Sequence, residues 1–399
     1  MITTINNKHK KLNFSSEREQ SQVCLNSAEH EKNQGRKVLN VPNLRFKEFQ
    51  GEWEKCKLLK ICTFFSGGTP SSSNKDFYGG NIPFIRSGEL HADSTELFIT
   101  QAGFDSSSAK MVEIGDLLLA MYGATSGDIA VSKIKGAINQ AILCIRTKQN
   151  KKFIESVWNK HVSKNLRKYL QGGQGNLSAD IIKGISFSFP TLKEQEKIAN
   201  LVSLLDERIA TQNKIIDKLQ SLIKGIAQKI VHSNKTNVRL SECVECSSST
   251  LQESDVCEHG AYPVYGANGI VGNLDNYNTE GEAVYIIKDG SGVGTVSYVT
   301  GKCSATGTLN TLQAKEGYSL QYLYYLLKVF NFEPYKTGMA IPHIYFKDYG
   351  KAKFFCPSYT EQLQYAQSLS AIDSKLLVEK NILTSLSMQK KYLLRQMFI

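Results

Sequence analysis

Cysteine and histidine residues form the first group in this sequence whose types and spacing could do chemistry. Cys243-Val-Glu-Cys246 is followed by Cys257-Glu-His259, which places four soft ligands of the kind that bind zinc close together. The second pair is Cys-x-His, however, whereas zinc sites more often use C-x2-C or H-x3-5-H spacing. The nine cysteines are an odd number, and several, such as Cys144, stand in apolar surroundings. We therefore predict reduced structural thiols and no metal, with zinc at Cys243, Cys246, Cys257 and His259 as the alternative.

The sequence lacks the motifs of the enzymes that a basic chain of this size suggests. No Pro-Pro dipeptide occurs, so the Asn/Asp-Pro-Pro-Tyr/Phe motif of adenine methyltransferases is missing. Neither Gly123-Ala-Thr-Ser-Gly127 nor Gly290-Ser-Gly-Val-Gly294 supplies the lysine of a G-x4-G-K-[ST] phosphate loop. The second run precedes a strand-like stretch, Val296 to Thr300, whereas a dinucleotide loop opens a helix, so we predict a tight hairpin there. The histidines show no catalytic pairing, and we predict that the chain is not an enzyme.

An excess of basic residues points to a polyanionic partner. The chain has 48 Lys and Arg against 37 Asp and Glu, a formal net charge of +11, and a pI near 9.0. Basic side chains that neutralise phosphates release condensed counterions, which favours binding to nucleic acid. Many basic proteins bind no nucleic acid, so charge alone leaves the partner open.

Polar residues at Gly-rich turns are the best candidates to contact such a partner, because the backbone can approach a groove there. Arg or Lys would favour guanine and Asn or Gln adenine, at about 1 to 3 kcal/mol for each bidentate contact. The alternative for each residue is ordinary turn or surface chemistry. The candidates are Arg86, Ser87, Tyr122, Thr125, Ser126, Gln171, Gln174 and Asn176 in the N-terminal half, and Tyr265, Asn268, Lys288, Ser291, Lys336 and His343 in the C-terminal half. A basic stretch of Lys160, Lys164, Arg167 and Lys168 fits phosphate contact or, equally, a solvated helix face.

These candidates belong to an internal repeat. Pro190-x3-Glu194-Gln195 and Pro357-x3-Glu361-Gln362 are separated by 167 residues, and Gly123 falls on Gly290 at the same offset. Each copy runs from short strand-like segments through a helical stretch and a Gly-containing loop to a strand that ends in proline and then a long helix. The sequence therefore predicts an α+β protein of two similar α/β modules with pseudo-twofold symmetry.

Each copy of the repeat ends in a long predicted helix. Thr191-x-x-Glu194 and Ser358-x-x-Glu361 predict a capping box at each start. Apolar residues then recur at heptad spacing, with a polar residue at the matching place, Gln212 and Glu379, and a rod of about 60 Å is expected. We predict that the two helices pair with each other, and a second copy of the chain is the alternative partner. The predicted seam consists of Ile198, Val202, Leu205, Ile209, Gln212, Ile216, Leu219, Ile223, Ile226 and Ile230 in the first helix and Leu369, Ile372, Leu376, Glu379, Leu383, Leu386 and Leu393 in the second.

Two similar modules at a fixed separation suit duplex DNA, whose major groove returns to one face about every 34 Å. The helix pair would act as a ruler, and the bases between the two contacted segments would not be read. Lys390, at a seam position, weakens the end of the second helix, which leaves that end free to face another subunit.

Several segments resemble a known family. Pro42-Asn-Leu-Arg-Phe46, Gly172-Gly-Gln-Gly-Asn176-Leu-Ser and Phe189-Pro190-x3-Glu194-Gln-Glu-Lys-Ile-Ala199 are similar to type I restriction–modification specificity (S) subunits. The resemblance extends over about residues 42 to 399, and the duplicated layout is its most specific part. The chain departs from the family in its N-terminal extension, its sparser second module, and Tyr365 in place of the isoleucine seen at Ile198.

The resemblance implies two target-recognition domains, each reading one half of a split double-stranded DNA site. It implies that the long helices pack as an antiparallel coiled coil and dock methyltransferase (M) subunits, two in number, and that restriction/translocation (R) subunits join them. Adenine methylation would be carried out by the partner. S-adenosylmethionine, ATP and Mg²⁺ would belong to partner subunits, with no cofactor in this chain.

No apolar run reaches the about 18 residues of a membrane span and no secretion signal is seen at the start, so a cytoplasmic protein without membrane contact is expected. Two alternatives for the function remain open: a coiled-coil interaction protein whose basic charge is incidental, and a nuclease whose site the motifs do not reveal.

The sequence predicts five segments. They are a poorly ordered polar extension (1–43), a first recognition domain (44–190), a central helix (191–232), a second recognition domain (233–357) and a C-terminal helix (358–399).

Overall fold

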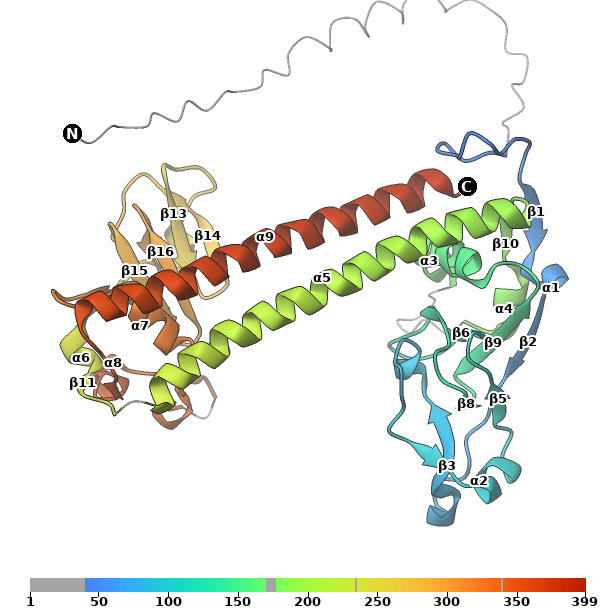
Figure 1. Ribbon diagram of the computed structural model, residues 1–399, viewed down its shortest axis with the longest axis horizontal. Coiled ribbons are helices and arrows are strands. Elements are labelled where there is room, and N and C mark those ends of the chain that lie inside the picture. The colour runs from blue at the N-terminus through green and yellow to red at the C-terminus, as the bar shows by residue number, and fades with distance from the viewer. Residues whose placement is uncertain (1–39, 170–176, 234, 339) are drawn as a thin grey trace, which may run out of the picture.

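Two β-rich domains lie at opposite ends of a pair of long helices (Figure 1). The computed structural model describes residues 40–169, 177–233, 235–338 and 340–399. We call residues 40–190 the first domain and residues 235–357 the second domain. The helices that join them are α5 (Leu192–Ser233, 42 residues) and α9 (Tyr359–Met397, 39 residues).

The first domain is built on two four-stranded sheets. One has the antiparallel strand order β2-β9-β6-β7, and the other has the order β4-β3-β8-β5, in which β3 and β8 run parallel. Strands β1 and β10 form a separate ribbon. The elements are β1 (Glu54–Lys57), α1 (Leu58–Ile61), β2 (Cys62–Ser66), β3 (Tyr78–Ile85), β4 (Phe98–Ile99), α2 (Gln101–Asp105), β5 (Lys110–Val112), β6 (Leu117–Ala120), β7 (Ile129–Val131), β8 (Gly136–Ile138), β9 (Ile142–Thr147), α3 (Lys151–Tyr169), α4 (Ala179–Gly184) and β10 (Ser186–Phe189), with 3-10 turns η1 (Lys75–Phe77) and η2 (Ser87–Glu89).

The second domain repeats this topology. Its antiparallel sheet β12-β18-β15-β16 matches β2-β9-β6-β7, its parallel pair β13-β17 matches β3-β8, and its ribbon β11-β19 matches β1-β10. The predicted α+β fold of two similar modules is thus confirmed. The elements are β11 (Val238–Arg239), α6 (Leu240–Cys243), β12 (Val244–Ser248), β13 (Tyr262–Gly266), β14 (Gly269–Leu274), β15 (Glu282–Ile287), β16 (Val296–Thr300), β17 (Ser304–Ala305), β18 (Leu309–Ala314), α7 (Leu320–Leu327), α8 (Phe346–Tyr349) and β19 (Lys353–Phe354), with 3-10 turns η3 (Glu253–Asp255) and η4 (Glu333–Tyr335).

Each domain has its own hydrophobic core, which the long helices extend. In the first domain Trp53, Leu119 and Trp158 are almost fully buried and pack in one cluster with Ile198 of α5. Where β6 begins, the buried Asp116 carboxylate accepts hydrogen bonds from the Arg146 guanidinium, with an Nη2–Oδ2 distance of 2.7 Å. In the second domain Leu312 packs in one cluster with Ile223 of α5 and Leu369 of α9. The long helices are therefore part of both domains.

The glutamate of the repeated motif has a different hydrogen-bond partner in each copy. At α9 the predicted capping box forms, since the Ser358 hydroxyl accepts from the Glu361 N–H and the Glu361 carboxylate accepts from the Ser358 N–H. At α5 only half of the predicted box forms: the Thr191 hydroxyl accepts from the Glu194 N–H at 3.4 Å, but the Glu194 carboxylate accepts two hydrogen bonds of 2.7 Å from the guanidinium of Arg45 instead of turning back to Thr191. Arg45 lies far away in the sequence, so local spacing could not reveal this partner.

The glutamine of the motif is buried in both copies. Gln195 donates to the carbonyl of Pro190 and to the side chain of Gln149, and accepts from the N–H of Asn150, which opens α3. Gln362 likewise donates to the carbonyl of Pro357 and accepts from the N–H of Ser319, which opens α7. These side chains pin each short helix to the start of the long helix.

Helices α5 and α9 pack against each other along their length and run antiparallel (Figure 1). The predicted seam positions are buried or half-buried along both helices. At the midpoint Gln212 Nε2 donates to the backbone carbonyl of Glu379 at 3.1 Å and to its carboxylate. Because 379 − 212 = 167, the repeat maps this contact onto itself, and the pseudo-twofold axis passes through it.

Both ends of the described chain pack on the first domain. The sequence predicts a polar extension through residue 43, but Asn40 bonds to Trp53 and Ser188 and so packs on the first domain. The C-terminal end of α9 is not left free for another subunit, because Met397 and Phe398 are buried in the core of the first domain. Lys390 is accommodated in the seam by an ion pair with Asp206.

Candidate nucleic-acid interface

The glycine runs singled out in the sequence form equivalent hairpin turns, one between β6 and β7 and one between β15 and β16. Gly123 and Gly290 have φ of 79° and 95°, a left-handed conformation that favours glycine. The turns close with the same bond, from the N–H of Gly127 to the Ala120 carbonyl and from the N–H of Gly294 to the Ile287 carbonyl. The loop that precedes α4 or α8 bonds to the residue at which the turn begins, from Leu177 N–H to the Met121 carbonyl after β6 and from Ile344 N–H to the Lys288 carbonyl after β15.

In the second domain this arrangement surrounds a hollow of about 680 Å³. Two residues predicted to contact nucleic acid, Lys288 and His343, line it. His343 Nδ1 lies 2.6 Å from Asp289 Oδ1, which fixes the ring against the turn. Ser291 is exposed at the tip of the adjoining hairpin. The hollow therefore offers hydrogen-bond donors and acceptors together with an ammonium group, as a base-contacting surface requires.

In the first domain the corresponding turn lies beside the 3-10 turn η2. The imidazole of His91, two residues after η2, lies 2.9 Å from the carboxylate of Asp128 at the end of the β6–β7 turn. This contact joins the segment that follows Arg86 and Ser87 to the end of the turn that carries Thr125. The Arg86 guanidinium is half-exposed and bonds to Glu89, which raises the pKa of Arg86 and leaves part of the fork open to a partner.

Other predicted contacts point inward or are paired. The Ser126 hydroxyl donates to the Met121 carbonyl, and Tyr265 packs on Tyr285 with ring centres 5.7 Å apart. Lys336 Nζ lies 2.6 Å from a Glu333 carboxylate oxygen. Tyr122 and Asn268 are exposed, but Asn268 lies on the separate β13–β14 hairpin and does not line the hollow.

Several predicted contact residues lie in or next to the segment 170–176, outside the described residues. Gln171, Gln174 and Asn176 lie outside the described residues. For Lys164, Arg167 and Lys168 the structure describes only their place in α3, not their side chains. Lys160 of the same stretch donates to the carbonyl of Phe398, so it holds the end of α9 rather than extending into solvent.

The hollow of the second domain also contains residues that the sequence analysis missed. Lys347 and Tyr345 line it, with the Lys347 ammonium 5.3 Å from the ring centre of Tyr345. Asn310 lines it as well and donates to the hydroxyl of Tyr349 at 2.8 Å. The signal for Asn310 was its place in the repeat, since Gly307-x-x-Asn310 matches Gly136-x-x-Asn139.

The residues weighed as zinc ligands do not come together. Among residues 40–169, 177–233, 235–338 and 340–399, no group of three or more His, Cys, Asp or Glu side chains is arranged to hold a metal ion. Cys243 instead lies beside Cys356, with 3.8 Å between their sulfur atoms, and this contact, together with burial, raises the pKa of the Cys243 thiol. Within the same residues, no helix is both long enough and apolar enough to cross a membrane.

The two halves of the chain each match the same known protein family. The family described as the type I restriction modification DNA specificity domain matches residues 50–221 and again residues 232–388. The chain belongs to this family. Each match covers one domain and most of the long helix that follows it, so one specificity-domain unit is a β-rich domain plus its helix.

Specificity subunits are among the relatives. The chain is 27% identical over 182 residues to the type I restriction enzyme MjaIX specificity subunit of Methanocaldococcus jannaschii, which covers 42% of each chain. It is 21% identical over 354 residues to the EcoprrI specificity subunit of Escherichia coli, which covers 81% of this chain and 88% of the relative. The chain thus spans about half the length of the M. jannaschii relatives it matches.

Solved structures of the family share the fold. The S subunit of a type I restriction–modification system from M. genitalium superposes with a TM-score of 0.65 at 18% identity, over 90% of this chain and 99% of that one. A chain from a study of assembly and conformational transition of the type I system gives a TM-score of 0.51 at 15% identity, over 86% of this chain and 96% of that one. At these identities the likeness concerns the specificity-subunit fold alone.

Proposed function

We propose that this chain is the DNA-specificity subunit of a type I restriction–modification complex, in which each domain reads one half of a bipartite DNA target. The supporting observation is the pseudo-twofold arrangement. Equivalent glycine hairpins stand in two domains of one topology, held by an antiparallel helix pair whose axis passes through Gln212 and Glu379. A rigid pair of this kind fixes the number of base pairs between the two contacted segments.

The spacing role can be tested by lengthening both helices. Duplicating residues 206–212 in α5 and the equivalent residues 373–379 in α9 adds one heptad to each helix and keeps the seam in phase. At about 1.5 Å per residue the domains move apart by about 10 Å, which is about three base pairs of duplex at 3.4 Å each. Selection from randomised duplexes should return the same half-sites with a spacer about three base pairs longer. An unchanged spacer would overturn the proposal, and insertion in α5 alone, which breaks the pairing, is the control.

The independence of the two domains can be tested by exchange. Replacing residues 44–188 with the equivalent module of another specificity subunit should change only one half of the selected target, because the second domain and both helices are untouched. A change in both halves would show that the domains do not read independently.

Direct contact through the second domain can be tested at Lys288, which lines the hollow beside the β15–β16 turn. Lys288→Ala should weaken binding to a cognate duplex by about 1 to 3 kcal/mol if the ammonium contacts a base, or lower the salt slope by about one if it contacts phosphate. The matched control is Lys302→Ala, because Lys302 follows the opposite end of the same hairpin. Equal effects of the two variants would count against the hollow as the contact surface.

The helix pair also offers a surface for partner subunits. Ile215 and Ile382 are equivalent in the repeat, since 382 − 215 = 167, and are 37% and 40% exposed. Leu204 is exposed as well, and a groove of about 600 Å³ between the helices is lined by Leu204 and Ile382. We propose that this apolar face docks two M subunits, because apolar side chains exposed on a rigid helix pair mark a protein interface.

The docking face has a direct test. Ile382→Glu should abolish co-purification with M subunits and leave the helical content unchanged. Ile270→Glu is the control, because Ile270 is more exposed, at 62%, but lies on the β13–β14 hairpin. Loss of association in both variants, or in neither, would argue against this face.

We propose further that the chain is non-catalytic and cytoplasmic, and that S-adenosylmethionine, ATP, Mg²⁺ and the R subunits act through the assembled complex. The sequence supports this by lacking a phosphate-loop lysine and a Pro-Pro motif. The eight cysteines among the described residues are unpaired, as suits a reducing compartment. Incubating the purified chain with plasmid and Mg²⁺ discriminates, since cleavage without partners would favour a nuclease.

A further inference from the structure

The places where α3 and α7 pack on the long helices are equivalent in the two copies but differ in charge. Asp206 of α5 and Asp373 of α9 are separated by 167 residues and occupy the same position in the repeat. Asn150 and Ser319 cap α3 and α7 in the same way, accepting from Phe153 N–H and Tyr322 N–H. We call these places the first junction and the second junction.

At the first junction the aspartate is neutralised from within the chain. Asp206 accepts hydrogen bonds from the Nζ atoms of Lys152 on α3 and Lys390 on α9, at 2.8 and 2.5 Å. Lys152 also pairs with Glu155 at 2.7 Å, so two ammonium groups meet two carboxylates. Burial opposes ionisation of Asp206, but these bonds hold its pKa below the ordinary range.

At the second junction both lysines are replaced. Gln321 stands on α7 where Lys152 stands on α3, and Ile223 stands on α5 at the position equivalent to Lys390. Asp373 is half-buried, and its carboxylate accepts only a long bond of 3.4 Å from the hydroxyl of Tyr325. Among the ion pairs of the described residues none includes Asp373, and Lys328 and Lys380, which line a neighbouring hollow with Asp373, do not form one with it.

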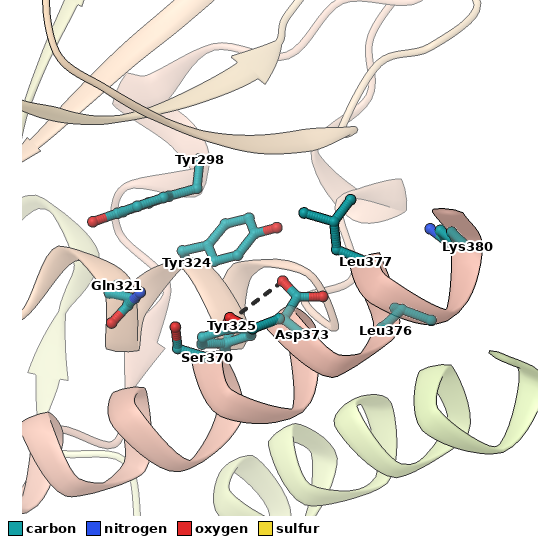
Figure 2. Close-up of a pocket in the computed structure, with 10 residues that line it drawn as sticks. Tyr298, Gln321, Tyr324, Tyr325, Ser370, Asp373, Leu376, Leu377 and Lys380 are labelled. Carbon is teal, nitrogen blue, oxygen red and sulfur yellow. Dashed lines mark hydrogen bonds between the residues drawn. The ribbon is translucent and has the colours of Figure 1, made fainter. Parts of the chain in front are cut away.

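Aromatic rings surround the space that the lysines leave. Tyr298, Tyr324 and Tyr325 line a hollow of about 330 Å³ together with Asp373 (Figure 2). The ring centres of Tyr298 and Tyr324 are 5.4 Å apart, and those of Tyr324 and Tyr325 are 4.9 Å apart. The first junction has Val131 in place of Tyr298, at the offset of 167 residues, and Glu155 in place of Tyr324, at the offset of 169 that also relates Asn150 to Ser319. These two rings therefore occur only at the second junction.

This combination matches an organic cation. Aromatic faces attract ammonium and guanidinium groups, and a carboxylate supplies the opposite charge. The Lys328 ammonium, 5.1 Å from the ring centre of Tyr324 and 5.9 Å from that of Tyr325, shows that these rings accept such a group. Leu377, which also lines the hollow and is 61% exposed, can pack against the apolar stem of such a group.

We propose that the hollow at Asp373 is a binding site for one cationic side chain, a lysine or arginine carried by a partner protein. The partner side chain would take the place that Lys152 and Lys390 fill at the first junction. The site gives the two ends of a nearly symmetric molecule different chemistry, because the first junction is closed by its own lysines and the second is left open. This inference does not depend on DNA recognition by the domains.

The test uses the full chain and small probes titrated by calorimetry. Butylguanidinium should bind saturably, whereas butylurea, its neutral counterpart, should not. Asp373→Asn should weaken butylguanidinium binding at least tenfold, with circular dichroism and the melting temperature unchanged as the check on folding. Absence of saturable binding, equal binding of butylurea, or an unaltered affinity in Asp373→Asn would each overturn the proposal.

Three further measurements define the occupant. Gln321→Lys restores the lysine of the first junction, and should raise the melting temperature and abolish butylguanidinium binding; unchanged binding would contradict the equivalence. Spermidine binding more than tenfold tighter than butylguanidinium would overturn the assignment to a side chain in favour of a free polyamine. Lys380 also lines the hollow, and binding seen only in Lys380→Met would mean that an internal lysine fills the site.

Discussion

Replacing Gln195 by methionine should destabilise the first domain by about 2 to 3 kcal/mol at roughly 1 kcal/mol per lost hydrogen bond. Methionine keeps the volume but can neither donate to Pro190 and Gln149 nor accept from Asn150, and the residue is only 1% exposed, so water cannot replace these partners. Gln362→Met loses two bonds instead of three, which predicts about 2 kcal/mol in the second domain.

The assay can separate the two domains. Both tryptophans of the chain, Trp53 and Trp158, are buried in the core of the first domain, so urea unfolding followed by tryptophan fluorescence reports on that core. With a slope of about 2 kcal/mol per molar urea, Gln195→Met should lower the midpoint by about 1 M. Gln362→Met is the matched control and should leave the tryptophan transition almost unchanged. A midpoint for Gln195→Met within about 0.2 M of the unmodified chain would refute the reasoning, as would equal shifts for the two variants.

Three other changes have outcomes set by the structure. Burial opposes ionisation of Asp116, but its hydrogen bonds and the nearby cations outweigh burial and lower its pKa. The ionised carboxylate therefore stabilises the folded state fully above the ordinary pKa of about 3.9, and this stabilisation is lost as the pH falls through the lowered pKa. Asp116→Asn should accordingly reduce the fall of the urea midpoint at acid pH. Arg45→Ala should cost about 3 kcal/mol by leaving the buried Glu194 carboxylate unpaired, and a loss below about 1 kcal/mol in urea unfolding would contradict a buried pair. Gly294→Ala should lower the melting temperature more than Gly301→Ala, because both have φ near 90° but only at Gly294 would a Cβ meet a neighbour, Phe332, at 3.0 Å; equal losses would show that the contact relaxes.

The sequence by itself determined the repeat, the starts of the long helices and their pairing. These features depend on local chemistry that recurs at fixed spacing. Proline before a hydroxyl residue and a glutamate marks where α5 and α9 begin. A heptad stripe must be buried somewhere, and two stripes in the same phase with a polar residue at the same place, Gln212 and Glu379, are satisfied by each other.

The candidate contact residues were predictable only in part. Turn chemistry located the β6–β7 and β15–β16 hairpins, since positive φ at Gly123 and Gly290 depends on the residue itself. It did not indicate which neighbouring side chains face outward. Ser126 turns back to the main chain and Tyr265 packs on Tyr285, because the adjoining strands decide which face of each strand is covered.

Tertiary structure alone decided what each charged residue does. Glu194 bonds to Arg45, and Lys390 and Lys152 close on Asp206, although these partners lie on separate elements far apart in the sequence. The same packing leaves Asp373 without an ion pair at the equivalent junction. A repeat is recorded in the spacing of residues along the chain, whereas an ion pair or an open pocket is set by which side chains the fold brings within a few ångströms.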